Sequence, residues 1–194
     1  SRTQLKVMKQ IIDDTMMLML QRRTLRPDYG WIDLKLDAIS GEDMFESDGI
    51  RGKNHIYSWI QGRGLEAIAT HLKWYDRVGW PSDDAKEELI SLGRSVSANL
   101  QRQRRSNGGH LYFLATDRSH PTEDTDVFTM SDLFCSRGLY AFNHDWGTEE
   151  ERRASRRYIT DTLQAIIGNK LVNDQIGFHP SQYQGRKAKA TGFG

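Results

Sequence analysis

Residues 54–77 read NHIYSWIQGRGLEAIATHLKWYDR, and this stretch decides the fold class. At 100° per residue, its apolar side chains form two stripes on nearly opposite sides of one helix. The first stripe holds Ile56, Trp59, Ile60, Ala67 and Trp74, and the second holds Leu65, Ile68, Leu72 and Tyr75. A helix with two apolar sides is usually buried between other helices, so the stretch predicts an interior helix of an all-α protein.

Three other segments, 4–20, 82–105 and 148–168, carry a single apolar stripe and predict surface helices. Ser82 is a candidate N-cap for the second of them, and Thr148 with Glu151 three residues later fits a capping box at the third. Residues 129–143 are apolar nearly all round, like residues 54–77, and predict a second interior helix.

One-sided and two-sided helices therefore alternate along the chain. This order predicts two concentric layers of antiparallel helices, with 54–77 and 129–143 in the inner layer. Five helices cannot close such a ring. Short β segments are expected in the connections, at 31–36 and 111–114.

Composition excludes several classes of protein. The 194 residues include 27 basic and 26 acidic side chains, a formal charge of +1, and 37% are hydrophobic. Apolar content of this size argues against disorder, and a charge near zero gives no long-range attraction for nucleic acid or an anionic membrane. No apolar run reaches the roughly 18–20 residues that span a bilayer, and a single Cys fits a reducing compartment. We expect a single cytoplasmic domain over residues 1–194, with no nucleic-acid or membrane partner.

Four short motifs follow one another along the chain. They are Tyr29-Gly30-Trp31, then Lys53 before Trp59-Ile60-Gln61-Gly62-Arg63, then Gly108-Gly109-His110-Leu111-Tyr112-Phe113, and finally Ser131-Asp132-Leu133-Phe134. This series resembles the N-acylglucosamine 2-epimerase superfamily, a group of sugar epimerases and isomerases. The chain departs from the family at Asp132, where the family motif has Glu.

The resemblance implies an (α/α)6 toroid, of which residues 1–194 would form about the first half. The domain would then be incomplete, with the remainder of the toroid and the acid/base histidines C-terminal to Gly194. The implied activity is that of a sugar 2-epimerase or aldose–ketose isomerase, which removes and returns a proton through an enediol(ate). No metal or redox cofactor is implied; the partner is a small sugar, and a homodimer is possible.

The resemblance also implies site residues. Arg63 would stabilise the negative charge of the enediolate, and Tyr112, Trp59 and Gln61 would bind the substrate. From the residues alone, other interpretations stay open. Arg63 lies within the first apolar stripe and could form a structural ion pair, while Tyr112 and Trp59 could be core residues and Gln61 structural.

Several other residues fit structural roles. The histidines show no metal-ligand spacing, and each is expected on the surface or in a loop: His55, His71, His110, His120, His144 and His179. Gly62 and Gly64 are expected where helices approach closely, and Cys135 is expected to be buried. The basic run at residues 102–105 could contact phosphate, although a solvated helix end explains it as well.

Two alternative functions remain. The first is a carbohydrate hydrolase or lyase on the same toroid, which would need two carboxylates; the candidates are Asp124, Asp126 and Asp132. The second is a non-catalytic sugar-binding or assembly protein with this fold.

Overall fold

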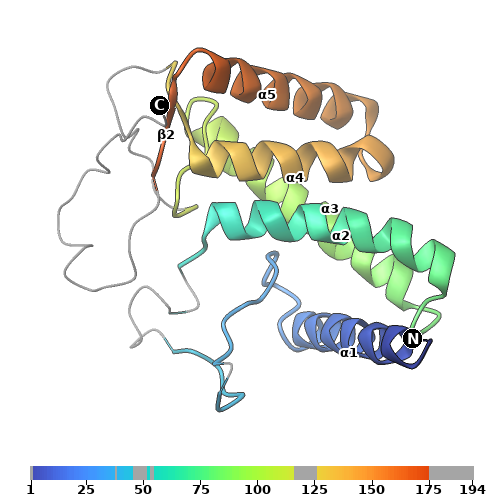
Figure 1. Cartoon of the computed structure of the whole chain (residues 1–194). Coiled ribbons are helices and arrows are strands. Elements are labelled where there is room, and N and C mark those ends of the chain that lie inside the picture. The colour runs from blue at the N-terminus through green and yellow to red at the C-terminus, as the bar shows by residue number, and fades with distance from the viewer. Residues whose placement is uncertain (1, 38, 46–51, 53–54, 116–125, 175–194) are drawn as a thin grey trace.

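The computed structural model describes residues 2–37, 39–45, 52, 55–115 and 126–174 (Figure 1). In this part of the chain the helices are α1 (Arg2–Leu25), α2 (Ser58–Val78), α3 (Ala85–Ser106), α4 (Met130–Trp146) and α5 (Glu149–Ile167). Two strands of two residues each, β1 (Phe128–Thr129) and β2 (Leu171–Val172), pair in parallel. The all-α prediction is confirmed. None of the helices in the described ranges is long and apolar enough to cross a bilayer.

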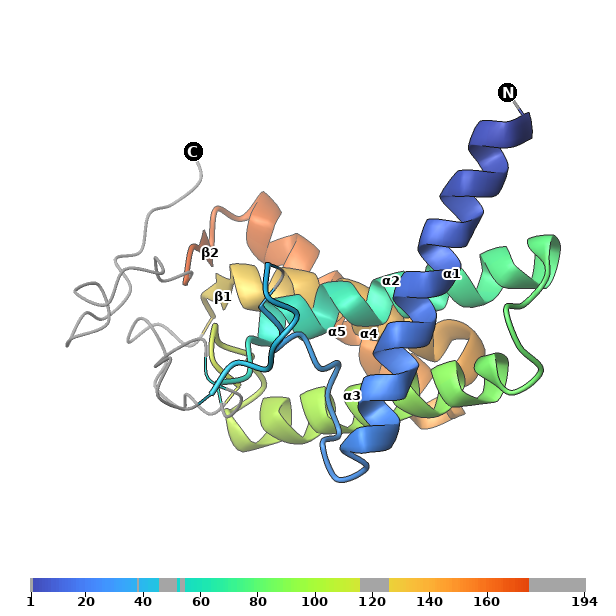
Figure 2. The ribbon, with the colours of Figure 1, turned by 90° about the horizontal axis from the view of Figure 1, so that it is seen from below.

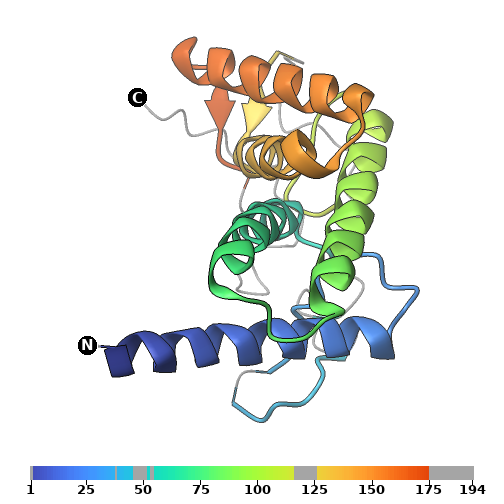
Figure 3. The ribbon, with the colours of Figure 1, turned by 90° about the vertical axis from the view of Figure 1, so that its right-hand side faces the viewer.

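The helices lie in two layers. α2 and α4 run side by side in the same direction, α3 and α5 run broadly the opposite way, and α1 crosses the other helices at a steep angle (Figures 1 and 2). Figure 3 looks along α2 and α4 and shows α1, α3 and α5 around them on three sides. Among the described helices, α2 and α4 therefore lie inside the other three, but α1 is not antiparallel to them as the sequence predicted.

The core lies between α2, α3 and α4. The second apolar stripe of α2 is fully buried, with Leu65, Leu72 and Tyr75 at 0% exposure. Side chains from α3 and α4 pack against this stripe, among them Leu89, Val96, Leu100, Leu139 and Phe142. Burying so many large apolar side chains stabilises the three helices together, at about 1.5–3 kcal/mol for each.

The opposite side of the inner helices is more exposed than their sequences predict. Trp59, from the first stripe of α2, is only half-buried, and Ala67 from the same stripe is exposed. On α4, Arg137, Tyr140 and His144 are exposed, so the prediction that this helix is buried all round is wrong. The physical reason is that no described element covers this side of the two helices (Figure 3).

The apolar stripe of α1 is also only partly used. Met16 and Leu20 are buried, whereas Leu5 and Met8 remain 68% and 59% exposed. Figure 2 shows the cause, because the N-terminal half of α1 projects past the side of α2, where no other described helix lies against it.

Glycines bring the backbones of α2 and α4 into contact. A Cβ atom at Gly138 would lie 2.1 Å from the carbonyl oxygen of Gly62, and one at Gly62 would lie 2.7 Å from the backbone nitrogen of Cys135. A Cβ at Gly64 would meet Ile32 Cδ1 at 2.3 Å. The prediction of close helix–helix approach is confirmed for Gly62 and wrong for Gly64, which meets a side chain of the non-helical segment at Ile32; the predicted burial of Cys135 is confirmed.

The predicted cap is confirmed at α5 and wrong at α3. The Thr148–Glu151 capping box is present on α5: the Glu151 N–H donates to Thr148 Oγ1 over 3.2 Å, and the Thr148 N–H donates to Glu151 Oε2 over 2.8 Å. Ser82 does not cap α3, which begins at Ala85 after Asp84, because no side chain there bonds to a free backbone N–H.

The strands predicted at 31–36 and 111–114 are absent. Each segment forms only an isolated bridge, Leu36 with Asp43 and Leu114 with Tyr57. Side chains take the place of a partner strand, because Gln61 binds both the N–H and the carbonyl of Ile32. In the second segment, the Leu111 N–H donates to the Asp132 carboxylate.

Replacing Gly138→Ala should destabilise the protein, because the new methyl group would overlap backbone atoms that cannot move aside. Overpacking of this kind lowers the free energy of unfolding by about 1–3 kcal/mol, even though Ala favours a helix by up to about 1 kcal/mol. Urea denaturation measures the change. Gly168→Ala is the control, since its Cβ would approach no neighbour closer than 3.3 Å; equal stability of the two variants would contradict the proposed contact.

Candidate functional site

A row of aromatic rings crosses the N-terminal ends of α2 and α4. The ring centroids of Tyr57 and Phe113 are 5.2 Å apart, and those of Phe113 and Trp59 are 6.2 Å apart. Trp59 in turn lies 5.9 Å from Phe134. We call these four residues the aromatic row. It draws side chains from the start of α2, the segment after α3 and the first turn of α4.

Backbone contacts hold the aromatic row in place. The Ser58 N–H donates to the carbonyl of Phe113 over 3.0 Å, and the Ala115 N–H donates to the carbonyl of Ile56 over 2.8 Å. These bonds join the entry to α2 with the segment that carries Phe113. Phe134 is brought close by Gly62, where a Cβ atom would lie 2.7 Å from the Phe134 carbonyl oxygen.

Arg63 lies over one end of the aromatic row. Its guanidinium carbon is 5.7 Å from the Trp59 ring centroid and 5.5 Å from that of Phe134. The side chain is exposed, and no carboxylate within the described ranges forms an ion pair with it. The structural ion pair that the sequence left open is therefore not found there. Two rings hold a charged guanidinium whose outer N–H groups face solvent.

Gln61 and Tyr112 are placed differently from Arg63. Gln61 is buried; its Nε2 donates to the Ile32 carbonyl over 2.9 Å, and its Oε1 accepts from the Ile32 N–H over 2.9 Å. This pair of hydrogen bonds to the backbone is the structural role that the sequence left open for Gln61. Tyr112 is also buried, at 4% exposure, and its contact with a substrate stays a prediction.

Trp59 connects Arg63 to the rest of the row. Its indole is half-buried and lies within 20° of parallel to the Phe113 ring. Its Nε1 is buried without a hydrogen-bond partner among the described residues. The Trp59 ring thus packs against the Arg63 guanidinium. The stacking of Trp59 on a sugar stays a prediction.

Asp132 joins four parts of the chain at the start of α4. This fully buried carboxylate accepts hydrogen bonds from the N–H of Leu111 at 2.7 Å and from the N–H of Thr129 at 2.9 Å. The Tyr158 hydroxyl also donates to it, and His110 Nδ1 lies 3.1 Å away. Burial and the nearby Asp132 charge raise the pKa of Tyr158 well above its usual value, so the phenol stays protonated.

These contacts weigh against the hydrolase alternative. Asp132 is saturated with donors and cannot reach a substrate. Asp126 is exposed and pairs with Lys170 at 3.4 Å, and Asp124 lies outside the described residues. No described pair of these carboxylates is placed to flank a glycosidic bond.

His110 lies in the loop after α3, as expected, but it is buried there rather than at the surface. It is 7% exposed, contacts Asp132, and packs edge-on against Phe128 at 4.8 Å. His120 and His179 fall outside the described residues. Within the described ranges, no group of three His, Cys, Asp or Glu side chains is placed to hold a metal ion.

Asp174 is a buried carboxyl that the sequence patterns did not reveal. It follows β2, is 6% exposed, and its Oδ1 accepts from the backbone N–H of Ser131 at 3.2 Å. Oδ2 has no hydrogen-bond partner among the described residues. Burial raises the pKa of Asp174 to about 6, and the charge of Asp132 adds to this effect. No local motif marks Asp174, because its burial depends on the pairing of β1 with β2.

Comparisons with protein-family models, with curated proteins and with solved structures found no match for this chain. The resemblance drawn from its motifs therefore stays a prediction, and any functional conclusion has to come from the site itself.

Asp174→Asn should stabilise the protein near neutral pH. Because the pKa of Asp174 is higher in the folded chain than its unfolded value, the folded state loses stability as pH rises from about 4 to about 6. A pKa shift of about two units corresponds to about 2–3 kcal/mol in the free energy of unfolding. Urea denaturation should show the variant more stable by this amount at pH 7.5 and equal to the parent at pH 4. A difference independent of pH would contradict the raised pKa.

Tyr158→Phe should lower the free energy of unfolding by about 2 kcal/mol, because it removes a hydrogen bond to a buried carboxylate. Tyr140→Phe is the matched control, since that ring is 37% exposed. Thermal or urea denaturation of both variants measures the difference. If both substitutions lower the free energy of unfolding equally, the hydrogen bond from Tyr158 to Asp132 does not stabilise the fold.

Proposed function

We propose that this chain belongs to a sugar 2-epimerase or aldose–ketose isomerase built on an (α/α)6 toroid. Residues 1–194 form about the first half of that toroid, and the enzyme acts on a small open-chain sugar in the cytoplasm. The observation that carries the proposal is Arg63, an exposed guanidinium held over Trp59 and Phe134 where two parallel helices begin.

The proposed proton transfer needs positive charge beside the carbonyl oxygen of the sugar. Removing the proton next to a sugar carbonyl puts negative charge on the carbonyl oxygen, and donors fixed in advance stabilise it. A guanidinium supplies several N–H donors in a planar fork, and the N-terminal ends of α2 and α4 add partial positive charge. Because the rings already hold Arg63, little reorganisation is needed when the charge develops.

The layered arrangement supports the toroid. α2 and α4 form an inner pair with an open side, as the inner helices of a ring around a funnel would. An apolar groove of about 450 Å³ lies between α1 and α2, lined by residues that include Ile12, Leu18, Leu36, Gly64 and Ala67. Under this proposal, the last inner helix of the ring closes the toroid by packing into that groove beside α2.

The acid/base groups of the mechanism lie outside the described residues, whereas Tyr112 lies within them. The acid/base histidines come from inner helices beyond Gly194, and Tyr112 hydrogen-bonds the substrate near the mouth of the funnel. The proton transfer itself requires neither a metal nor a redox cofactor, because near-neutral histidines supply it. A homodimer is compatible with this arrangement.

Hydrogen exchange in D2O tests the activity directly. The protein with its C-terminal remainder is incubated with a panel of aldoses, ketoses and N-acylhexosamines, and ¹H NMR follows the proton next to the carbonyl, at C2 of an aldose or N-acylhexosamine and at C1 of a ketose. An epimerase or isomerase replaces this proton with deuterium and forms an isomer. Cleavage of an added disaccharide without exchange would support the hydrolase instead, and binding without either reaction would support a sugar-binding protein.

Arg63→Ala should lower the rate of exchange by about 10²–10³-fold, the effect of removing one fixed donor at an oxyanion. Stability should change by no more than about 0.5 kcal/mol, because the side chain is exposed. Arg94→Ala, an exposed arginine on α3, is the control and should leave the exchange rate unchanged. Full activity in the folded Arg63→Ala variant would remove this residue from the site.

A further inference from the structure

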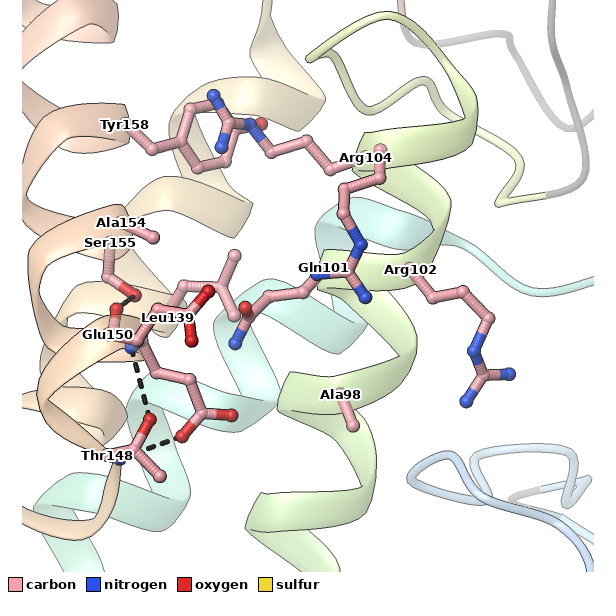
Figure 4. A pocket seen from close by; sticks show the side chains of 12 residues that line it. Ala98, Gln101, Arg102, Arg104, Leu139, Thr148, Glu150, Ala154, Ser155 and Tyr158 are labelled. Carbon is pink, nitrogen blue, oxygen red and sulfur yellow. Dashed lines mark hydrogen bonds between the residues drawn. The ribbon is translucent and has the colours of Figure 1, made fainter.

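A polar cavity of about 490 Å³ lies between the outer helices α3 and α5 (Figure 4). Gln101, Arg104 and Arg105 line it from α3, and Glu150, Glu151 and Tyr158 line it from α5. We call it the α3–α5 cavity. It belongs to the outer layer, whereas the aromatic row lies at the ends of the inner helices, so it is separate from the site described above.

One end of the cavity carries a fixed positive charge. The guanidinium carbon of Arg104 lies 3.8 Å from the Tyr158 ring centroid, and its Nε donates to the Gly109 carbonyl over 2.7 Å. Figure 4 shows this stacked pair at one end of the cavity. Within the described ranges, the terminal amino groups of Arg104 form no ion pair, and the same holds for exposed Arg105. The arginine is thus oriented before any ligand arrives.

The other end carries negative charge. Glu150 is exposed, and Glu151 uses Oε2 to accept the Thr148 N–H at 2.8 Å. Neither carboxylate forms an ion pair with a described residue. Glu151 and Tyr158 are seven residues apart on α5, which places them about 10 Å apart along the helix axis. Neither carboxylate lies within ion-pair distance of Arg104 or Arg105, so both charges are left for a ligand that reaches from one end of the cavity to the other.

We infer that the α3–α5 cavity binds a short peptide with free termini, its ammonium group at Glu150 and Glu151 and its carboxylate at Arg104 and Arg105. An extended residue spans at most about 3.3–3.6 Å, so three residues match the separation of about 10 Å. The volume falls within the range of about 300–1,000 Å³ typical of small-ligand sites. Ala98, Leu139 and Ala154 provide apolar lining for small side chains between the charged ends.

Isothermal titration with trialanine tests the inference. Trialanine should bind with a saturable curve, and more tightly than alanine or pentaalanine, whose charges are too close together or too far apart. N-acetylation and C-amidation should each weaken binding about fivefold, the effect of one partly exposed ion pair. Absence of saturation, or equal affinity for the blocked peptides, would overturn it.

Variants assign each terminus to its end of the cavity. Glu150→Gln and Arg105→Gln should each weaken trialanine binding about fivefold, whereas the exposed controls Glu87→Gln and Arg156→Gln, outside the cavity, should not. N-acetylation should cost less in Glu150→Gln than in the parent protein, because the two changes remove the same contact. Additive losses would show that the ammonium group does not meet Glu150, which would reject the proposed orientation.

Discussion

The contact between the backbones of α2 and α4 is the constraint on which the rest of the structure depends. It is possible only because Gly62 and Gly138 have no side chains; the position of a Cβ at Gly138 is 2.1 Å from the Gly62 carbonyl oxygen. The same contact places Phe134 beside the residue that follows Gly62, which is Arg63. The stacking of the guanidinium on Phe134 is thus a consequence of how closely the two helices pack, and a larger helix separation would leave Arg63 over Trp59 alone.

Side-chain hydrogen bonds satisfy backbone groups that would pair with a neighbouring strand in a sheet. The segments near residues 32 and 111 are extended, yet they lie against Gln61 and Asp132 rather than against a strand. The Asp132 carboxylate accepts hydrogen bonds from two backbone N–H groups and from the Tyr158 O–H, which ties the segment at residue 111 to α4 and α5. This arrangement fixes the segment that ends in Phe113, and through it one ring of the aromatic row.

Periodicity predicted the helices because each buries an apolar stripe against its neighbours. The Thr148–Glu151 cap was predicted by a different rule, since the free N–H groups at a helix start need acceptors, and Gly62 was predicted from the lack of a side chain. What local patterns could not predict is which apolar stripe meets another element. The stripe of α1 at Leu5 and the stripe of α2 at Trp59 look alike in sequence, but their exposure is set by neighbours distant in the chain. No local pattern predicts the burial of Asp174 for the same reason, because this burial depends on the pairing of β1 with β2.

The side of the inner helices that faces away from the core is polar rather than apolar. Arg137 on α4 pairs with Glu66 on α2 at 2.6 Å, and Lys73 on α2 pairs with Asp145 on α4 at 2.7 Å. A face meant to pack against another helix would lose stability by burying these charges, because desolvation costs several kcal/mol per ion. A face that lines a water-filled funnel bears no such cost. The exposed, charged side of α2 and α4 therefore fits a site for a hydrated, hydroxyl-rich ligand better than it fits a buried helix interface, and Arg63 is a cation on that side that pairs with no carboxylate among the described residues.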